Sequence, residues 1–297
     1  MLKRKVTFLG LFIALPLFAS AIASPSVVGA AEKPANVAGV SLRFVSRFTS
    51  GAGLGGAEIS AMDAKSKRIF SVNGAQNTVN IIDISKVKNP TLVKVVNLTG
   101  KGVIGIQSIA AMNGMVAVAA SVGSKTDAGR VFLMDVNGKL NSSAPNGVLV
   151  GSLPDSIHFS PDGRYVLTAN EGEPKDYCKV GGILPETSDP KGSVSVIDVR
   201  ANKLQAKTLD FSAFNDRANG IISVGGRIYG PGATVAQDIE PEYIAISDDS
   251  KYAWVTLQEN NAIATVDLAS AKVLGISGLG FKNYNSEATG IDPSDRD

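Results

Sequence analysis

Short runs of alternating apolar and polar residues recur along the chain, and Gly, Asn or Asp residues bound each run. An alternation with period two is typical of β-strands, and no stretch shows the roughly 3.6-residue period of a convincing amphipathic helix. The clearest runs each contain an aspartate near their end. They are VNIIDIS, RVFLMDV, SVSVIDV and AIATVDL, with Asp83, Asp135, Asp198 and Asp267 aligned. The pattern predicts an all-β protein.

These runs belong to a longer repeat. A matching run precedes each of them, in the order AEISAMD, QSIAAMN, DSIHFSPDGRYVLTAN and EYIAISDDSKYAWVTLQ. A further run follows each of them, in the order TLVKVVNL, GVLVGSL, LQAKTLDF and KVLGISGL. Each unit thus contains four strands, and repeated four-stranded units are typical of the blades of a β-propeller. The repeat predicts a β-propeller with about four blades over residues 39–297.

Acidic residues gather where this fold would place one face of the propeller. Residues just before each first strand lie on the same face as the loops between second and third strands. Glu58, Asp155 and Glu242 occupy equivalent positions before three of the first strands. Two loops, 171–192 and 212–237, are unusually long for a compact repeat, and long loops are often functional. We therefore expect an acidic rim on this face.

Calcium is the ligand that such a rim suggests, because it takes about six to eight oxygen ligands from carboxylates, amides, carbonyls and water. The candidate metal ligands are Glu171, Glu173, Asp176, Asp238, Glu240, Glu242, Asp292, Asp295 and Asp297. The last three of these, Asp292, Asp295 and Asp297, resemble part of a calcium-binding loop but lack its complete pattern. The alternative is that these acids begin turns and face solvent without binding an ion.

The N-terminus has the features of an export signal. Lys3, Arg4 and Lys5 precede an uncharged apolar run, and small residues follow it. We expect a signal peptide over residues 1–23, a flexible linker over 24–38 and the propeller domain over 39–297. The run is short for a membrane span, which needs about 20 residues, so no span is expected in the mature chain.

Removal of this segment changes the charge balance. The chain carries 29 Lys and Arg residues against 27 Asp and Glu residues, and the mature part would carry 26 against 27. No basic run with interleaved aromatic residues remains, so no nucleic-acid partner is expected. Cys178 is the only cysteine, which excludes an intrachain disulfide. With His158 as the only histidine, a histidine-rich zinc site cannot form.

Two further residues carry structural expectations. His158 aligns with residues that are small in the other units, namely Ala61, Ala111 and Ala245, which favours a buried structural histidine over a catalytic base. Trp254 lies in the apolar run YAWVTL and is expected in the core.

Several long segments, in order, resemble one family. ANEGEPKDY, GSVSVIDV, LDFSAFN, RIYGPGATVAQDIEPEYIAIS, VTLQENNAIATVDL and LGFK are similar to segments of the choice-of-anchor I family. The resemblance covers most of 57–297 and implies an extracytoplasmic propeller, which is periplasmic, secreted or at the cell surface. That family is similar to a mesenchyme-specific cell-surface glycoprotein, and some members carry an alkaline phosphatase label. Its members typically continue beyond GIDPSDRD, so we expect a propeller truncated at its C-terminus.

Two functions follow from these observations. The first is a secreted or cell-surface binding and scaffold module with a calcium-binding acidic face and an unknown surface ligand. The alternative, which the resemblance implies, is a calcium-dependent, alkaline phosphatase-like phosphoesterase acting on a phosphoester substrate. A bound metal can polarise a phosphoryl oxygen and activate water. No nucleophile motif in the sequence identifies catalytic residues.

Overall fold

The computed structural model describes residues 36–37, 40–176 and 185–284. Contacts divide the chain into two units, 1–44 and 45–297. In the first unit, β1 (Asn36–Val37) pairs antiparallel with β2 (Val40–Ser41). The second unit contains the four repeats.

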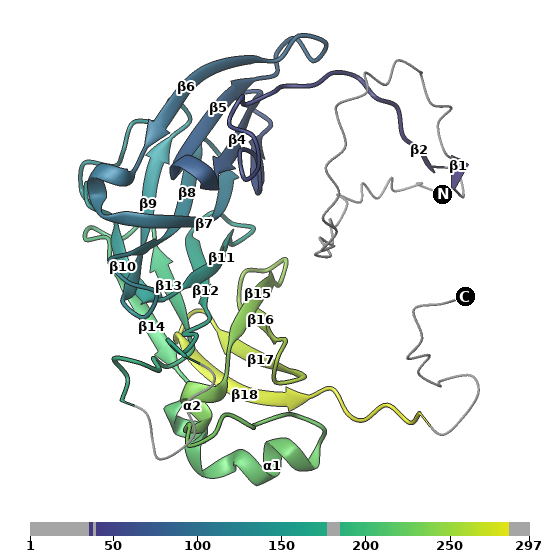
Figure 1. The fold of residues 1–297 in the computed structure, drawn as a ribbon, viewed down its shortest axis with the longest axis vertical. Helices are drawn as coiled ribbons and strands as arrows, with labels where there is room; N and C mark the ends of the chain where they lie inside the picture. Colours follow the sequence, from purple (N-terminus) through teal and green to yellow (C-terminus); the bar gives the residue numbers. More distant parts are fainter. Residues whose placement is uncertain (1–35, 38–39, 177–184, 285–297) are drawn as a thin grey trace. The chain divides into compact units, whose positions relative to one another are not determined.

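Four sheets of four antiparallel strands form the second unit, and within each sheet the strands neighbour one another in chain order (Figure 1). The first sheet has β3 (Ser60–Asp63), β4 (Arg68–Asn73), β5 (Thr78–Asp83) and β6 (Thr91–Asn97). The second has β7 (Val103–Met112), β8 (Met115–Val122), β9 (Ala128–Asp135) and β10 (Val148–Ser152). The third has β11 (Pro154–Phe159), β12 (Tyr165–Asn170), β13 (Ser193–Asp198) and β14 (Ala206–Asp210). The fourth has β15 (Pro241–Ile246), β16 (Tyr252–Leu257), β17 (Ala262–Asp267) and β18 (Lys272–Gly278). The prediction of four four-stranded units is confirmed, whereas the closed ring of a propeller and its truncation stay predictions.

The repeated aspartate ends the third strand of every sheet and shapes the turn that follows. Its Oδ1 atom accepts a hydrogen bond from a backbone N–H of that turn. The donors are Ser85 at 2.7 Å for Asp83, Asn137 at 2.8 Å for Asp135, Arg200 at 2.9 Å for Asp198 and Ser270 at 2.7 Å for Asp267. Aspartate suits this place because its short side chain can replace a backbone turn partner. The aligned aspartates are therefore structural.

Apolar side chains fill the space between successive sheets. Phe70 and Phe132 belong to a buried cluster of the first and second sheets. Leu133 and Ile157 belong to a cluster of the second and third, and Leu167 and Val255 to a cluster of the third and fourth. The first strands are also neighbours, since β7 contacts both β3 and β11, and β11 contacts β15. This packing brings the beginnings of β11 and β15 close together.

Short helices occupy the long segment between β14 and β15, where the sequence indicated only a loop. They are the 3-10 helix η3 (Ser212–Arg217), α1 (Ala218–Ser223) and α2 (Val235–Asp238). Two more 3-10 turns, η1 (Gly74–Gln76) and η2 (Thr99–Lys101), lie in the first part of the unit. A capping box of Thr234 and Gln237 begins α2, whose four residues are all buried. Helices this short carry no recognisable periodicity.

The structure places Trp254 on an exposed sheet face, so the prediction that it lies in the core is wrong. Ala253, Val255 and Leu257 point into the cluster shared with the third sheet, whereas the Trp254 side chain is 44% exposed on the opposite face. An apolar run cannot show which of its two faces is covered. His158, by contrast, packs edge-on against Tyr243 with ring centroids 4.6 Å apart, and burial lowers its pKa to about 4.

Candidate metal centre

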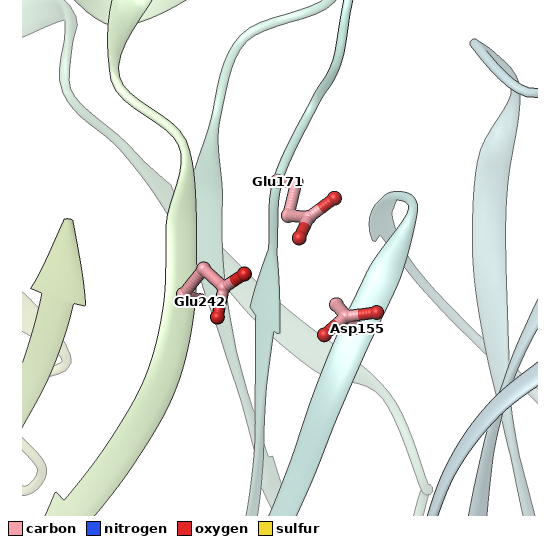
Figure 2. Close-up of side chains that lie close together, drawn as sticks. All are labelled: Asp155, Glu171 and Glu242. Carbon is pink, nitrogen blue, oxygen red and sulfur yellow. The ribbon is translucent and has the colours of Figure 1, made fainter. Parts of the chain in front are cut away.

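Three carboxylates converge where the third and fourth sheets meet. Asp155 is the second residue of β11, Glu242 is the second residue of β15, and Glu171 directly follows β12. One carboxylate oxygen of each lies within 4.8 Å of the other two. Figure 2 shows the three side chains on neighbouring segments around a common space. We call Asp155, Glu171 and Glu242 the carboxylate triad.

The local sequence explains why these side chains meet. Asp155 and Glu242 each follow a proline at the beginning of a first strand, and the register with the next strand shifts just there. Such a bulge changes the direction of a side chain relative to the regular pleat. The backbone N–H of Glu171 donates to the carbonyl of Leu153 at 2.9 Å, which holds Glu171 beside the turn before β11.

The triad is a region of uncompensated negative charge. All three side chains are half-buried, and no cationic residue within the described ranges forms an ion pair with them. Burial raises the pKa of Glu171 to about 9, and the neighbouring charges, Asp155 first, add to this effect. Burial also raises the pKa of Asp155 and of Glu242, with further contributions from Glu173 and Asp155, respectively. Like charges this close disfavour ionisation unless a cation separates them.

The other predicted ligands from the β12–β13 segment lie outside the triad. Glu173 forms an ion pair with Lys125, so its charge has a partner. Asp176 lines a separate cavity. Cys178 and the predicted ligands Asp292, Asp295 and Asp297 lie outside the described residues.

Asp238 is held by a hydrogen-bond network. Its carboxylate accepts from the backbone N–H groups of Tyr229, at 3.1 Å, and of Gly230. Asn260 Nδ2 donates to the same carboxylate at 3.0 Å, and Asn260 Oδ1 accepts from the backbone N–H of Glu240 at 3.1 Å. Asp238 and Glu240 are therefore not members of the triad, although both are neighbours of Glu242 in sequence and the charge of Glu240 contributes to the raised pKa of Glu171.

Asp189 is an acidic residue that was not among the predicted ligands. Its side chain is 3% exposed and lines the same cavity as Asp176, Asp238 and Glu240. It lies in an irregular segment before β13, where no periodicity marks a position. Asp155 was placed on the acidic rim by its equivalence to Glu242, but it was not among the predicted ligands.

The residue after Glu171, Gly172, packs closely against the backbone of Lys191 and Gly192. Gly172 has a φ of +68°, and a Cβ atom there would lie 2.6 Å from the backbone carbon of Lys191 and 2.7 Å from the nitrogen of Gly192. A left-handed backbone and this lack of space both favour glycine.

We expect Gly172→Ala to lower the free energy of unfolding by at least about 1–3 kcal/mol and to displace Glu171. Chemical denaturation would measure this loss. Gly220→Ala is the control, because Gly220 lies in α1, where an added Cβ atom would have no neighbour within 4 Å, and this variant should gain about 0.5–1 kcal/mol. Equal stability of Gly172→Ala and the unaltered protein would contradict the assignment of strain to Gly172.

The donor set of the triad fits calcium. Carboxylate oxygens are hard ligands, and calcium binds them at about 2.3–2.6 Å, so ligand oxygens around one ion lie within roughly 5 Å of one another. The triad meets this spacing and would supply three ligands to such an ion. It is the one group of three or more such residues that meets it within the described part of the chain.

Family comparison agrees with the repeat. Residues 58–297 match the choice-of-anchor I domain. The chain belongs to the choice-of-anchor I family. Membership of the choice-of-anchor I family suggests an extracytoplasmic location. Within the described residues, no helix has the length and apolar character needed to cross a membrane.

Solved structures resemble this choice-of-anchor I chain at low identity. Hydrazine synthase of Kuenenia stuttgartiensis is 16% identical with a TM-score of 0.46, over 78% of this chain and 52% of that one. The periplasmic gluconolactonase PpgL of Pseudomonas aeruginosa is 15% identical with a TM-score of 0.46, over 75% and 57%. A putative 6-phosphogluconolactonase from Bacteroides uniformis is 14% identical with a TM-score of 0.40, over 79% and 52%. The chain therefore spans little more than half of these structures. No curated protein matches it.

Proposed function

We propose that this protein is an extracytoplasmic binding and scaffold module whose carboxylate triad binds calcium. The observation that carries the proposal is the convergence of three half-buried carboxylate oxygens within 4.8 Å, without an ion pair from the described residues. Burial first, and repulsion from neighbouring carboxylates second, raise their pKa values, and a divalent cation would offset both effects. The N-terminal residues 1–23 would act as the export signal, since a basic start and an apolar run precede small residues.

Calcium would connect two sheets at this position. Asp155 and Glu171 belong to the third sheet or its border, and Glu242 belongs to the fourth. A bound ion would hold β11, the end of β12 and β15 in one arrangement. The loops beside these strands would then form a rigid platform, which is how folds with repeated blades commonly present binding loops. The role of calcium in this proposal is therefore structural.

Calorimetric titration with calcium tests the proposal. Calcium sites in extracellular modules have Kd values for calcium of about 10⁻⁴–10⁻³ M, and we expect the triad to bind calcium in this range. Calcium at about tenfold above Kd should stabilise the protein by about 1.4 kcal/mol, which would raise Tm by about 3–6 °C. Asp155→Asn and Glu242→Gln should each abolish this shift.

Glu58→Gln is the matched control. Glu58 occupies the position before β3 that corresponds to Asp155 and Glu242, but it is not part of the triad. This variant should bind calcium with unchanged affinity. Melting curves of the unaltered protein that coincide in calcium and in chelator would contradict the proposal, as would an equal loss of binding in Glu58→Gln.

A further inference from the structure

A second acidic feature lies beside the segments that carry the triad. A cavity of about 310 Å³ lies between four short segments. Its lining residues are Pro174, Asp176, Asp189, Tyr229, Gly230, Pro231, Ala233, Gln237, Asp238 and Glu240. Four of its lining residues are acidic, namely Asp176, Asp189, Asp238 and Glu240. None of these residues belongs to the triad. We call this space the acidic cavity.

Asp189 is the informative residue of the acidic cavity. Its side chain is only 3% exposed, yet no donor from the described part of the chain bonds to its carboxylate. Its backbone is held by two hydrogen bonds: the Asp189 N–H donates to the Pro185 carbonyl at 3.0 Å, and Gln237 Nε2 donates to the Asp189 carbonyl at 2.9 Å. Buried carboxylates are costly unless paired, and native proteins satisfy nearly all of them. Asp189 is buried as a residue, borders the cavity and has no described donor to its carboxylate, which favours a ligand with a donor or a positive charge.

Asp238 provides a contrast in the same cavity. It is also buried, but two backbone N–H groups and Asn260 Nδ2 already donate to its carboxylate. This carboxylate needs no ligand for its hydrogen bonds and still contributes negative charge. The cavity thus combines one carboxylate fixed by the protein with one that has no donor among the described residues.

The acidic residues of the cavity are not grouped as closely as those of the triad. Within the described residues, no three acidic side chains of the cavity bring their oxygens within 4.8 Å of one another. The carboxylates are instead distributed around a space whose volume falls at the lower end of small-molecule sites. A larger cation with several donors would reach more of them than a single metal ion would.

The other lining residues fit an aliphatic stem. Pro174 and Pro231 contribute apolar rings, and Tyr229, which is 61% exposed, contributes an aromatic ring and a backbone fixed by Asp238. An aromatic face attracts an ammonium or guanidinium group, and apolar rings pack against methylene groups. The acidic residues and the apolar rings of the cavity therefore both favour a cationic group carried on an aliphatic stem.

We propose that the acidic cavity binds an ammonium or guanidinium group carried on an aliphatic stem, with Asp189 as its main anionic partner. Such a group occurs in free diamines and polyamines and in exposed Lys or Arg side chains of a partner protein. The site would give the binding module a specificity for cationic ligands, and it does not depend on calcium at the triad.

The test uses the full chain in calcium buffer, with calorimetric titration of cadaverine, agmatine and a capped Ala-Arg-Ala peptide. The neutral counterparts are 1-pentanol and the capped Ala-Gln-Ala peptide. We expect the cationic probes alone to bind. Asp189→Asn should weaken that binding by about 10–100-fold, because it removes a charge-assisted contact. Glu58→Gln should bind as the unaltered protein does.

Asp189→Asn keeps the shape of the side chain and removes an uncompensated buried charge, so it should fold. Its calcium affinity serves as the check that the triad is intact, and Glu240→Gln serves as a second cavity variant. Binding of the free amines would assign the site to small cations, and binding of the peptide would assign it to a protein side chain. Failure of every cationic probe to bind, or equal binding to Asp189→Asn, would overturn the proposal. Competition between calcium and cadaverine that Asp189→Asn abolishes would also overturn it, since the cavity would then be a metal site.

Discussion

Without calcium, the protein is expected to lose stability as the pH rises from about 6.5 to about 9. Burial and neighbouring charges raise the pKa of Glu171 from its ordinary value of 4.5 to about 9. The folded protein therefore holds a proton that the unfolded chain releases above pH 4.5. Because the folded state binds more protons, the free energy of unfolding falls with pH until about pH 9.

The interval above pH 6.5 isolates Glu171 from two other buried groups. Burial lowers the pKa of His158 to about 4 from 6.5, so its contribution to stability is lost only as the pH falls below 6.5. Burial raises the pKa of Asp189 to about 6, so most of its effect lies at lower pH. Of the other groups near the triad, Glu173 is paired with Lys125, and Glu240 and Glu259 add negative charge.

We expect a loss of about 1–2 kcal/mol between pH 6.5 and 9, after allowance for solvent screening of a half-buried site. That corresponds to a fall in Tm of about 3–6 °C. Thermal unfolding in chelator at several pH values would measure it. Glu171→Gln should remove most of this slope, because glutamine keeps the shape and does not ionise. Calcium should also remove it, since metal affinity rises as the ligands lose their protons. A slope that persists in Glu171→Gln would assign the effect to other groups.

The strands were predictable because the sequence repeats a local physical requirement. Each third strand ends in an aspartate that accepts a hydrogen bond from the following turn, so the same residue recurs at Asp83, Asp135, Asp198 and Asp267. The exposure of Trp254 was not predictable in the same way. Burial depends on whether another layer covers that face of the sheet, and an apolar run carries no such information.

The triad was predictable only in part. Its members Glu171 and Glu242 were predicted as ligands, and the equivalence of first strands placed Asp155 and Glu242 on the same rim. Sequence proximity then suggested that Asp238 and Glu240 would join Glu242. They do not, because Asp238 ends α2 and turns toward Tyr229, whereas Glu242 lies in β15. Neighbours in sequence diverge where a helix gives way to a strand.

Asn260 should be the most sensitive polar residue of this region. It is 1% exposed, and its Nδ2 atom lies within hydrogen-bond distance of three acceptors. These are the Arg227 carbonyl at 3.0 Å, the Asp238 carbonyl at 2.9 Å and the Asp238 carboxylate at 3.0 Å. Its Oδ1 atom accepts from the Glu240 N–H at 3.1 Å. One side chain thus joins the β16–β17 turn to the backbone of Arg227 and to Asp238 and Glu240, which line the acidic cavity.

Asn260→Ala is expected to lower the free energy of unfolding by about 3–4 kcal/mol, because each buried group left without a partner costs about 1–3 kcal/mol and these costs overlap. Tm should fall by about 6–16 °C. Asn260→Asp should be at least as unstable, since it replaces the donor with a second carboxylate against Asp238. Asn202→Ala, at an exposed position, should change stability by less than about 0.5 kcal/mol. Denaturant unfolding of the three variants would measure these changes in the free energy of unfolding. A loss below about 1 kcal/mol in Asn260→Ala would show that the segments around the cavity hold together without this network.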